Sequence, residues 1–512
     1  MMLSLLIAVP LLGALVVALL PRSSHVTARY VAFGVSILTL VMSVALLREF
    51  DIDSGGYQIT EQHEWIGALG VHWALGVNGI GLTMIFLTTV LTPIVLLASW
   101  RDKELDPART SSYFAWMLVL EALAIGVFAA TDVFVFYVLF EATLIPLYFL
   151  IGAHGGGQRS YAAVKFLIYN LVGGLIMLAS VVGLYVLSSQ QGGATFLHED
   201  LMGLEMSQTT ERLLFLGFFI AFAIKAPLWP LHTWLPDAAA SATPGTSVLM
   251  VSVVDKIGTF GMIRWCLELF PGASDWASPV VITLAVISIL YGALLAIGQD
   301  DLRRLIALTS VSHFGFIILG IFAFTTTSMT GSVLYMFNHG LSTAILFLVA
   351  GMMVARRGSA RISDFGGVQK VAPVLSGVLL VGGLSSLSLP GLAPFVSEFL
   401  VLAGTFTRSI PAAAFATLGM VLAAVYILLM YQRTMTGPVT EHTALLPDLS
   451  RREVGALSPA IVLIIGLGFV PQPLLSVIDP AVEPVLSTVG IGDPPQRAPI
   501  DLTHDETEGA HE

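Results

Sequence analysis

Long apolar runs separated by short polar breaks are the dominant pattern along this chain. Each run approaches the roughly 20 residues that an α-helix needs to cross about 30 Å of hydrocarbon. The runs lie near residues 2–20, 29–48, 77–99, 112–130, 133–152, 161–187, 212–235, 246–268, 279–298, 304–324, 329–354, 372–407, 411–432 and 455–475. A transmembrane β-barrel would instead show alternating segments of about ten residues. The pattern therefore predicts an all-α polytopic membrane protein with about 14 transmembrane helices.

Prolines interrupt two of these spans. The seventh contains Pro227 and Pro230, and the twelfth contains Pro390 and Pro394. Proline removes a backbone hydrogen bond, and unwound backbone at membrane depth is tolerated only beside protein or water. Discontinuous helices at matching places in two halves are typical of inverted repeats around an ion path. We therefore expect discontinuous helices 7 and 12 within two inverted five-helix repeats, although ordinary proline kinks are the alternative.

These repeats set the expected division of the chain. It consists of an N-terminal three-helix segment (1–110), a first repeat of helices 4–8 (111–270), a second repeat of helices 9–13 (271–435), and a C-terminal helix with an acidic tail (436–512).

Composition narrows the chemistry. Hydrophobic residues make up 56% of the chain and charged residues 11%, whereas soluble domains carry about 25% charged residues. The net charge of −11 argues against nucleic acid as a partner. The single cysteine, Cys266, leaves no intrachain disulfide and no cysteine-ligated metal or iron–sulfur cluster. Nucleotide-binding motifs and nucleophile elbows are also missing, so we expect this chain to bind no metal and no cofactor.

The distribution of Lys and Arg predicts the orientation. Most of the 23 Lys and Arg residues lie in loops that follow odd-numbered spans, whereas the loops after even-numbered spans are acidic. Cytoplasmic loops hold the positive excess. We therefore expect both termini on the non-cytoplasmic side of the cell (inner) membrane.

Four ionisable residues lie inside the spans, namely Glu141, Lys225, Lys256 and Glu398. A charge at the bilayer centre costs about 2.5–3.5 kcal/mol on insertion scales, so each is a candidate functional residue. Alternatively, Glu141 and Lys225 form a structural ion pair, and the other two are satisfied by hydroxyl or backbone groups. Because apolar replacement of a buried pair is often neutral or stabilising, stability alone rarely explains such residues. We favour the interpretation that these residues exchange protons.

Accessory candidates are weaker. Glu121, central to the fourth span, could brace a neighbouring helix or carry protons. His232, His313 and His339 could relay protons near neutral pH, or they could be hydrogen-bonded packing residues. His313 is the strongest of the three because it begins an apolar run.

Three further residues have structural interpretations. Asp255 precedes Lys256 and points about 100° away around the helix, so it could serve another path or a surface. Arg264 is near a helix end and is expected to extend to the membrane interface. Asp132 is expected to be a helix N-cap.

Three segments resemble a known family. They are FEATLIPLYFLIG at residues 140–152, KAPLWPLHTWLPDA at 225–238 and SVSHFG at 310–315, and they are similar to the antiporter-like subunits of respiratory complex I. The second motif is specific to a superfamily that includes subunits of cation/proton antiporters and membrane-bound hydrogenases. The resemblance, which covers nearly the whole chain, implies fourteen helices and one proton channel. It also implies Glu141 paired with Lys225, Lys256 as the central relay with His313 nearby, and Glu398 as the exit residue.

Within this family the chain looks most like the subunit M branch of NADH-quinone oxidoreductase. That branch ends its path on glutamate where subunits L and N use lysine, and this sequence has Glu398. It also lacks the long lateral helix of subunit L. Asp255 departs from the family, because a neutral residue is expected before Lys256.

The resemblance also implies partners. The chain would translocate protons beside other membrane-arm subunits, especially L and N, while FMN, iron–sulfur clusters and quinone bind to other subunits. Two alternatives remain. One is a subunit of a cation/proton antiporter or membrane-bound hydrogenase, and the other is a membrane subunit that only anchors its neighbours.

Overall fold

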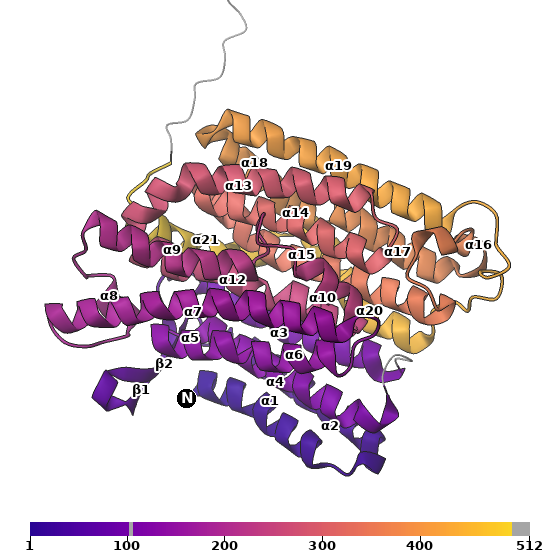
Figure 1. The fold of residues 1–512 in the computed structure, drawn as a ribbon, viewed down its shortest axis with the longest axis horizontal. Helices are drawn as coiled ribbons and strands as arrows, with labels where there is room; N and C mark the ends of the chain where they lie inside the picture. Colours follow the sequence, from indigo (N-terminus) through magenta and orange to yellow (C-terminus); the bar gives the residue numbers. More distant parts are fainter. Residues whose placement is uncertain (102–105, 494–512) are drawn as a thin grey trace, which may run out of the picture.

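The helices of this chain run back and forth between the two ends of an elongated bundle (Figure 1). The computed structural model describes residues 1–101 and 106–493, so Lys103 and the predicted acidic tail lie outside the described residues. The elements of the first part are α1 (Met2–Leu19), α2 (His25–Leu46), β1 (Gln58–Ile66), β2 (Val71–Val77), α3 (Gly79–Ala98), α4 (Thr110–Ala129), α5 (Val133–Ala142), α6 (Leu144–Gly152), α7 (Arg159–Gln191), α8 (His198–Leu201), α9 (Gln208–Lys225), α10 (Leu235–Ser241), α11 (Pro244–Leu249) and α12 (Lys256–Gly261).

The second part is helical throughout. Its elements are α13 (Pro271–Ile297), α14 (Leu302–Phe322), α15 (Thr326–Arg357), α16 (Val368–Val371), α17 (Pro373–Ser386), α18 (Ala393–Arg408), α19 (Ile410–Met435), α20 (Arg451–Phe469) and α21 (Gln472–Val489). In the described part of the chain, twelve helical segments are long and apolar enough to cross a membrane. They coincide with twelve of the predicted spans, which confirms the polytopic all-α class. The total of fourteen and the inverted repeats stay predictions.

The remaining two predicted spans are the broken pairs α9–α10 and α17–α18. Pro227 and Pro230 lie in the linker 226–234, and Pro390 lies in the linker 387–392. Pro394 is the second residue of α18, where its missing N–H breaks no helical hydrogen bond. The Trp234 indole donates a 3.0 Å hydrogen bond to the Ile224 carbonyl and so fastens the first linker. The predicted discontinuities in helices 7 and 12 are confirmed.

A two-stranded antiparallel sheet joins α2 to α3, where the sequence indicated only an acidic loop. Its Glu61 carboxylate accepts hydrogen bonds from the Leu3 N–H (2.8 Å) and the Ser4 hydroxyl (2.6 Å). Asp132 caps α5 as predicted, and it also accepts from the His72 N–H of β2 at 2.9 Å. The hairpin is therefore tied to both α1 and α5.

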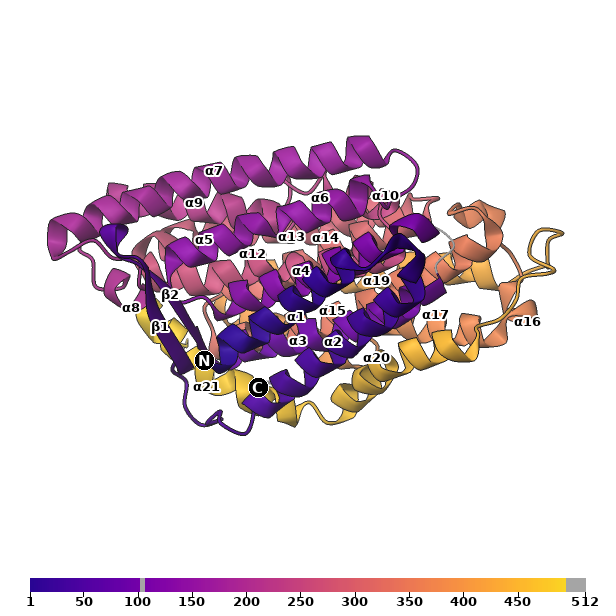
Figure 2. The same ribbon diagram turned by 90° about the horizontal axis from the view of Figure 1, so that it is seen from below.

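A second unpredicted element is α21. The sequence placed a last span at 455–475, but α20 ends at Phe469, and α21 begins after Pro471. It packs against α3 and α15, where the Thr330 hydroxyl donates to Asp479 at 2.8 Å. Figure 2 shows α8 and α21 at the end of the bundle that carries the hairpin, which we call the hairpin end.

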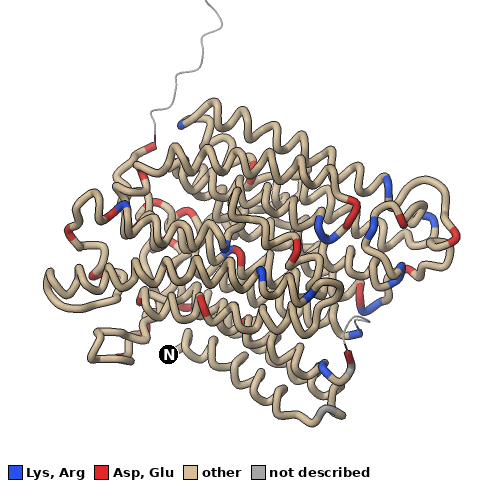
Figure 3. Tube along the Cα trace, in the orientation of Figure 1, with Lys and Arg blue, Asp and Glu red and all other residues tan. Residues whose placement is uncertain are grey.

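The opposite end holds most of the positive residues (Figure 3), and we call it the arginine-rich end. Between the two ends, the helices form an outer and an inner layer. The outer helices α1, α2, α7, α13 and α19 expose many apolar side chains, as lipid contact requires. In the segments Pro244–Leu267, Leu302–Phe322 and Thr326–Arg357, the apolar stretch long enough to cross a membrane is buried throughout inside the chain. These three inner segments carry Lys256, His313 and His339.

Candidate functional site

Lys225 is the last residue of α9, directly before the first broken linker. Its side chain is only 1% exposed. The ammonium donates a 3.0 Å hydrogen bond to the Thr143 hydroxyl and lies 4.7 Å from the centre of the Phe140 ring. The carbonyl end of a helix carries partial negative charge, so this position favours a cation.

Glu141 lies near the end of α5, but it is not in contact with Lys225. Its Oε1 atom is buried without a hydrogen-bond partner. The carboxylate packs against Gly174 of α7, where an added Cβ would lie 1.8 Å from Oε1. The two charges still interact electrostatically. The predicted pairing of Glu141 with Lys225 is thus seen here as an electrostatic interaction without a salt-bridge contact, because Lys225 donates to Thr143 instead.

Asp255 lies between the two buried lysines. It follows a π-helical segment, Met250–Val254, and neither of its carboxylate oxygens has a hydrogen-bond partner. It interacts electrostatically with both Lys256 and Lys225. Because its side chain is fully buried, the alternative that it faces a surface is wrong. Gly258 brings this helix close to the end of α9, since a Cβ there would lie 2.6 Å from the Ala226 nitrogen.

Lys256 contacts His339, which the sequence ranked below His313. The ammonium lies 2.6 Å from His339 Nδ1, donates to the Val251 carbonyl at 2.9 Å, and lies 4.6 Å from the centre of the Phe314 ring. His339 is a residue of α15, which packs against α11 and the π-helical segment Met250–Val254. The direct partner of the central lysine is therefore His339.

His313 is the next group beyond His339. The centres of the two imidazole rings are 5.2 Å apart. His313 Nδ1 contacts the Tyr335 hydroxyl at 2.5 Å, and its Nε2 lies 3.3 Å from Ser386 Oγ and 3.5 Å from the Tyr426 hydroxyl. Neither tyrosine was among the predicted residues, although Tyr335 lies one helical turn before His339 and could have been found from that spacing.

Glu398 is buried on α18 near these tyrosines. It interacts electrostatically with Tyr335 and Tyr426, and Ser388 of the second broken linker is beside it. The structure thus brings Lys256, His339, His313 and Glu398 into one buried polar line that crosses from the first half of the chain to the second.

The other accessory candidates lie outside this line. Glu121 of α4 is buried next to Thr92, and neither of its oxygens has a hydrogen-bond partner. His232 lies in the first broken linker, and its ring centre is 5.4 Å from that of Tyr291. Neither residue contacts the four residues of the line.

The prediction that Arg264 extends to the membrane interface is wrong. Its guanidinium is buried, donates to the Ala130 carbonyl, and lies 4.4 Å from the centre of the Tyr57 ring. The neighbouring Glu268 carboxylate accepts from the Tyr57 hydroxyl at 3.2 Å and lies 2.7 Å from His198 Nε2. This cluster could not be found from the sequence, because Tyr57 precedes β1 and His198 begins α8, both far from Arg264 along the chain.

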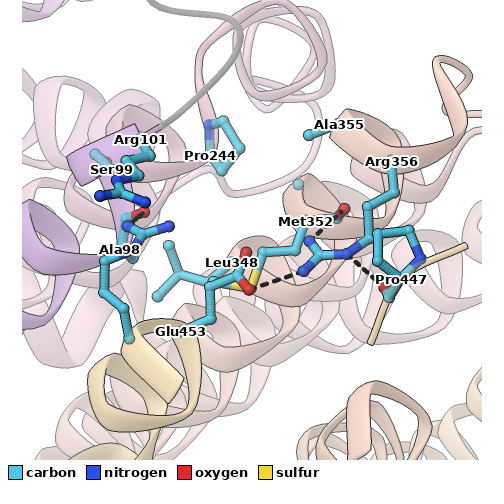
Figure 4. Close-up of a pocket in the computed structure, with 12 residues that line it drawn as sticks. Ala98, Ser99, Arg101, Pro244, Leu348, Met352, Ala355, Arg356, Pro447 and Glu453 are labelled. Atoms are coloured by element: carbon cyan, nitrogen blue, oxygen red, sulfur yellow. Dashed lines mark hydrogen bonds and ion pairs between the residues drawn. The ribbon is translucent and has the colours of Figure 1, made fainter. Parts of the chain in front are cut away.

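At the arginine-rich end, a cavity of about 180 Å³ lies between α3, α11, α15 and α20 (Figure 4). Its Arg356 guanidinium donates to Glu453 and to the Pro447 carbonyl, both at 2.8 Å. This arginine therefore ties α15 to α20. Among residues 1–101 and 106–493, no group of three or more His, Cys, Asp or Glu side chains is placed to hold a metal ion.

Known proteins are similar to this chain in sequence and in fold. Residues 130–423 match the family model described as NADH:quinone oxidoreductase/Mrp antiporter, TM. NADH-quinone oxidoreductase subunit M of Mycobacterium tuberculosis is 50% identical, with 96% of this chain and 95% of that relative aligned. The subunit M of Rhodobacter capsulatus is 36% identical over 94% of this chain and 95% of its own length.

The solved structures agree with these relatives. A chain of respiratory complex I from Thermus thermophilus superimposes with a TM-score of 0.87 at 30% identity, covering 96% of this chain and all of that one. A chain of the Mrp complex from Dietzia has a TM-score of 0.84 at 22% identity and covers 95% and 98%, which shows a shared fold. The chain therefore belongs to the subunit M family of NADH-quinone oxidoreductase.

Proposed function

We propose that this chain carries protons across the membrane within an NADH:quinone oxidoreductase, driven by quinone reduction in other subunits. The observation that carries the proposal is the buried polar line from Lys256 through His339 and His313 to the tyrosines beside Glu398. Each of these groups can bind and release a proton or pass one through a hydroxyl. Burial in the inner layer isolates the line from lipid.

The driving step in this proposal is a change in the distance between Glu141 and Lys225. Two unit charges 4 Å apart attract by about 4 kcal/mol at an effective dielectric constant of 20. Moving one charge against the membrane potential takes about 2.3 kcal/mol per 100 mV. The energy gained or lost when this contact forms or breaks is therefore large enough to move a proton against the membrane potential. The mechanism needs two states, one with Glu141 and Lys225 in contact and one with them separated.

The proton would then move along the line. When Glu141 approaches Lys225, the lysine keeps its proton. When they separate, the proton passes to Lys256, with the Asp255 carboxylate stabilising positive charge between the two lysines. His339 and His313 relay it to Glu398, which releases it. Under this proposal the arginine-rich end faces the cytoplasm, and both termini face the other side of the cell membrane.

This function requires partners. The chain would lie in the membrane arm beside the antiporter-like L and N subunits, and FMN, iron–sulfur clusters and quinone would be held by other subunits. Mass spectrometry of proteins that copurify with the tagged chain tests this assembly directly.

The proton path is tested by Lys225→Ala in the assembled complex. NADH-driven proton uptake into proteoliposomes, followed with a pH-sensitive dye, should fall severely while the complex stays assembled. Lys370→Ala is the matched control, because Lys370 is exposed in the helix α16 at the arginine-rich end. Undiminished pumping in Lys225→Ala would refute the assignment.

A second candidate function is sodium/proton exchange without a redox partner, which the Mrp antiporter part of the matching family model favours. Vesicles containing the chain and its copurifying partners would then show sodium-dependent proton exchange without NADH. Proton uptake that requires NADH and does not depend on sodium would exclude this function.

A further inference from the structure

Arg264 is a buried cation that the proton line does not use. It belongs to the π-helical segment Met262–Leu267, on the same continuous helix as Lys256. Its Nη2 atom is buried without a hydrogen-bond partner. Among the described residues, no carboxylate lies within salt-bridge distance of its guanidinium. An arginine side chain keeps its proton under all ordinary conditions, so this site holds a permanent positive charge.

The position of Arg264 is between Lys256 and the hairpin end. Arg264 is eight positions after Lys256, which corresponds to roughly 12 Å along a helix. One turn beyond Arg264 stands Glu268, whose carboxylate faces Tyr57 and His198. Both of these residues also line a cavity of about 200 Å³ between the hairpin and α8. Polar groups therefore extend from the cavity at the hairpin end to Glu268, and Arg264 is the next charged residue along the helix toward Lys256.

We propose that Arg264 is an electrostatic barrier that prevents protons on Lys256 from leaving through the first half of the chain. This inference rests on the proposed proton path. The cation, held by the Ala130 carbonyl and the Tyr57 and Phe260 rings, stands where an excess proton would have to pass. At an effective dielectric constant of about 20, a fixed unit charge about 12 Å away lowers the occupancy of a second positive charge about tenfold, and at half that distance about a hundredfold.

Such a barrier would give the proton path a single direction, toward Glu398. With the first half closed at the hairpin end, a proton that has reached Lys256 from Lys225 moves on through His339 and His313 toward Glu398. The aromatic cage keeps the guanidinium fixed without neutralising its charge. A carboxylate in direct contact would have removed most of the barrier.

The test measures passive proton leak in the reconstituted whole complex, with no NADH, under an imposed pH gradient and potassium diffusion potential. Arg264→Gln keeps a donor for the Ala130 carbonyl but loses the charge, and it should raise the leak several-fold above the original complex. Arg264→Lys keeps the charge and should stay tight. If Arg264→Gln does not assemble, Arg264→Met provides the same loss of charge.

A second substitution separates a lost barrier from damaged packing. The double variant Arg264→Gln with Lys256→Met should be tight again, because the leak needs a proton-binding group at position 256. A leak that persists in the double variant, or an assembled Arg264→Gln complex as tight as the original, overturns the proposal. NADH-driven pumping of the original complex is measured separately, so failure of the barrier and failure of the proposed function give different results.

Discussion

The contact between Lys256 and His339 gives the sharpest prediction for the proton line. The 2.6 Å distance between Lys256 Nζ and His339 Nδ1 makes the imidazole the main side-chain acceptor for a completely buried ammonium. A hydrogen bond to a charged group contributes about 1.5–3 kcal/mol. In His339→Leu that contribution disappears, so the affinity of Lys256 for its proton should fall by about one to two orders of magnitude.

His339→Asn separates the two roles that the histidine could have. The asparagine carbonyl can accept from Lys256 as Nδ1 does, but an amide cannot take up a proton and pass it on. If His339 relays protons, His339→Asn should assemble normally, oxidise NADH in uncoupled membranes, and fail to pump. His63→Asn is the matched control, because His63 is an exposed histidine of β1.

The assay is the ratio of proton uptake to NADH oxidation in proteoliposomes. A ratio in His339→Asn equal to that of the original complex would refute the relay and leave His339 as a packing residue. A lowered ratio in the His63→Asn control would show that the assay responds to general damage.

Three other substitutions follow from the same structure. Gly174→Ala would place a Cβ 1.8 Å from Glu141 Oε1, so the carboxylate must move by about 1.5 Å; pumping should fall although no charge is removed, whereas Gly34→Ala, which meets nothing within 4 Å, should pump normally. Tyr335→Phe removes a hydroxyl next to the buried histidine of α14 and should slow proton uptake more than NADH oxidation in uncoupled membranes; equal slowing of both would contradict a role in the line. Burial alone would raise the pKa of Glu61, but the Met1 amino group, the Ser4 hydroxyl and two backbone N–H groups hold that pKa below its usual range. Its stabilisation of the first turn of α1 is therefore complete above about pH 4.3 and is lost as the pH falls through the lower folded pKa. Hydrogen exchange of that turn should be faster in Glu61→Gln than in the original chain at pH 7, and the difference should vanish in acid; a constant difference would exclude this carboxylate.

Apolar runs of helical length predicted most of the fold, because lipid requires every backbone polar group to be bonded within the segment. The two broken helices could be predicted for the same reason, since the prolines remove those bonds at defined places. The β-hairpin could not be predicted from the sequence. Two strands alone are marginally stable, and this pair depends on contacts of Glu61 with α1 that only the folded chain provides.

For the candidate site, too, some features could be predicted from the sequence and others could not. The sequence identified the buried charges, because a charge in an apolar run is conspicuous. It could not rank His339 above His313, since that order depends on a contact between Lys256 and His339, which lie 83 positions apart along the chain. It also placed Arg264 at the membrane interface, because its burial depends on Tyr57, a residue more than 200 positions earlier in the chain.

The helix that carries Lys256 contains two π-helical segments, Met250–Val254 and Met262–Leu267, one on each side of α12. In the first, the Asp255 N–H bonds the Met250 carbonyl five residues back instead of four. Such a turn accommodates one extra residue. One residue corresponds to roughly 100° of rotation around an α-helix. The first π-helical segment therefore sets the direction in which Lys256 faces, because in an uninterrupted α-helix the residues after it would be rotated relative to those before it by about that angle.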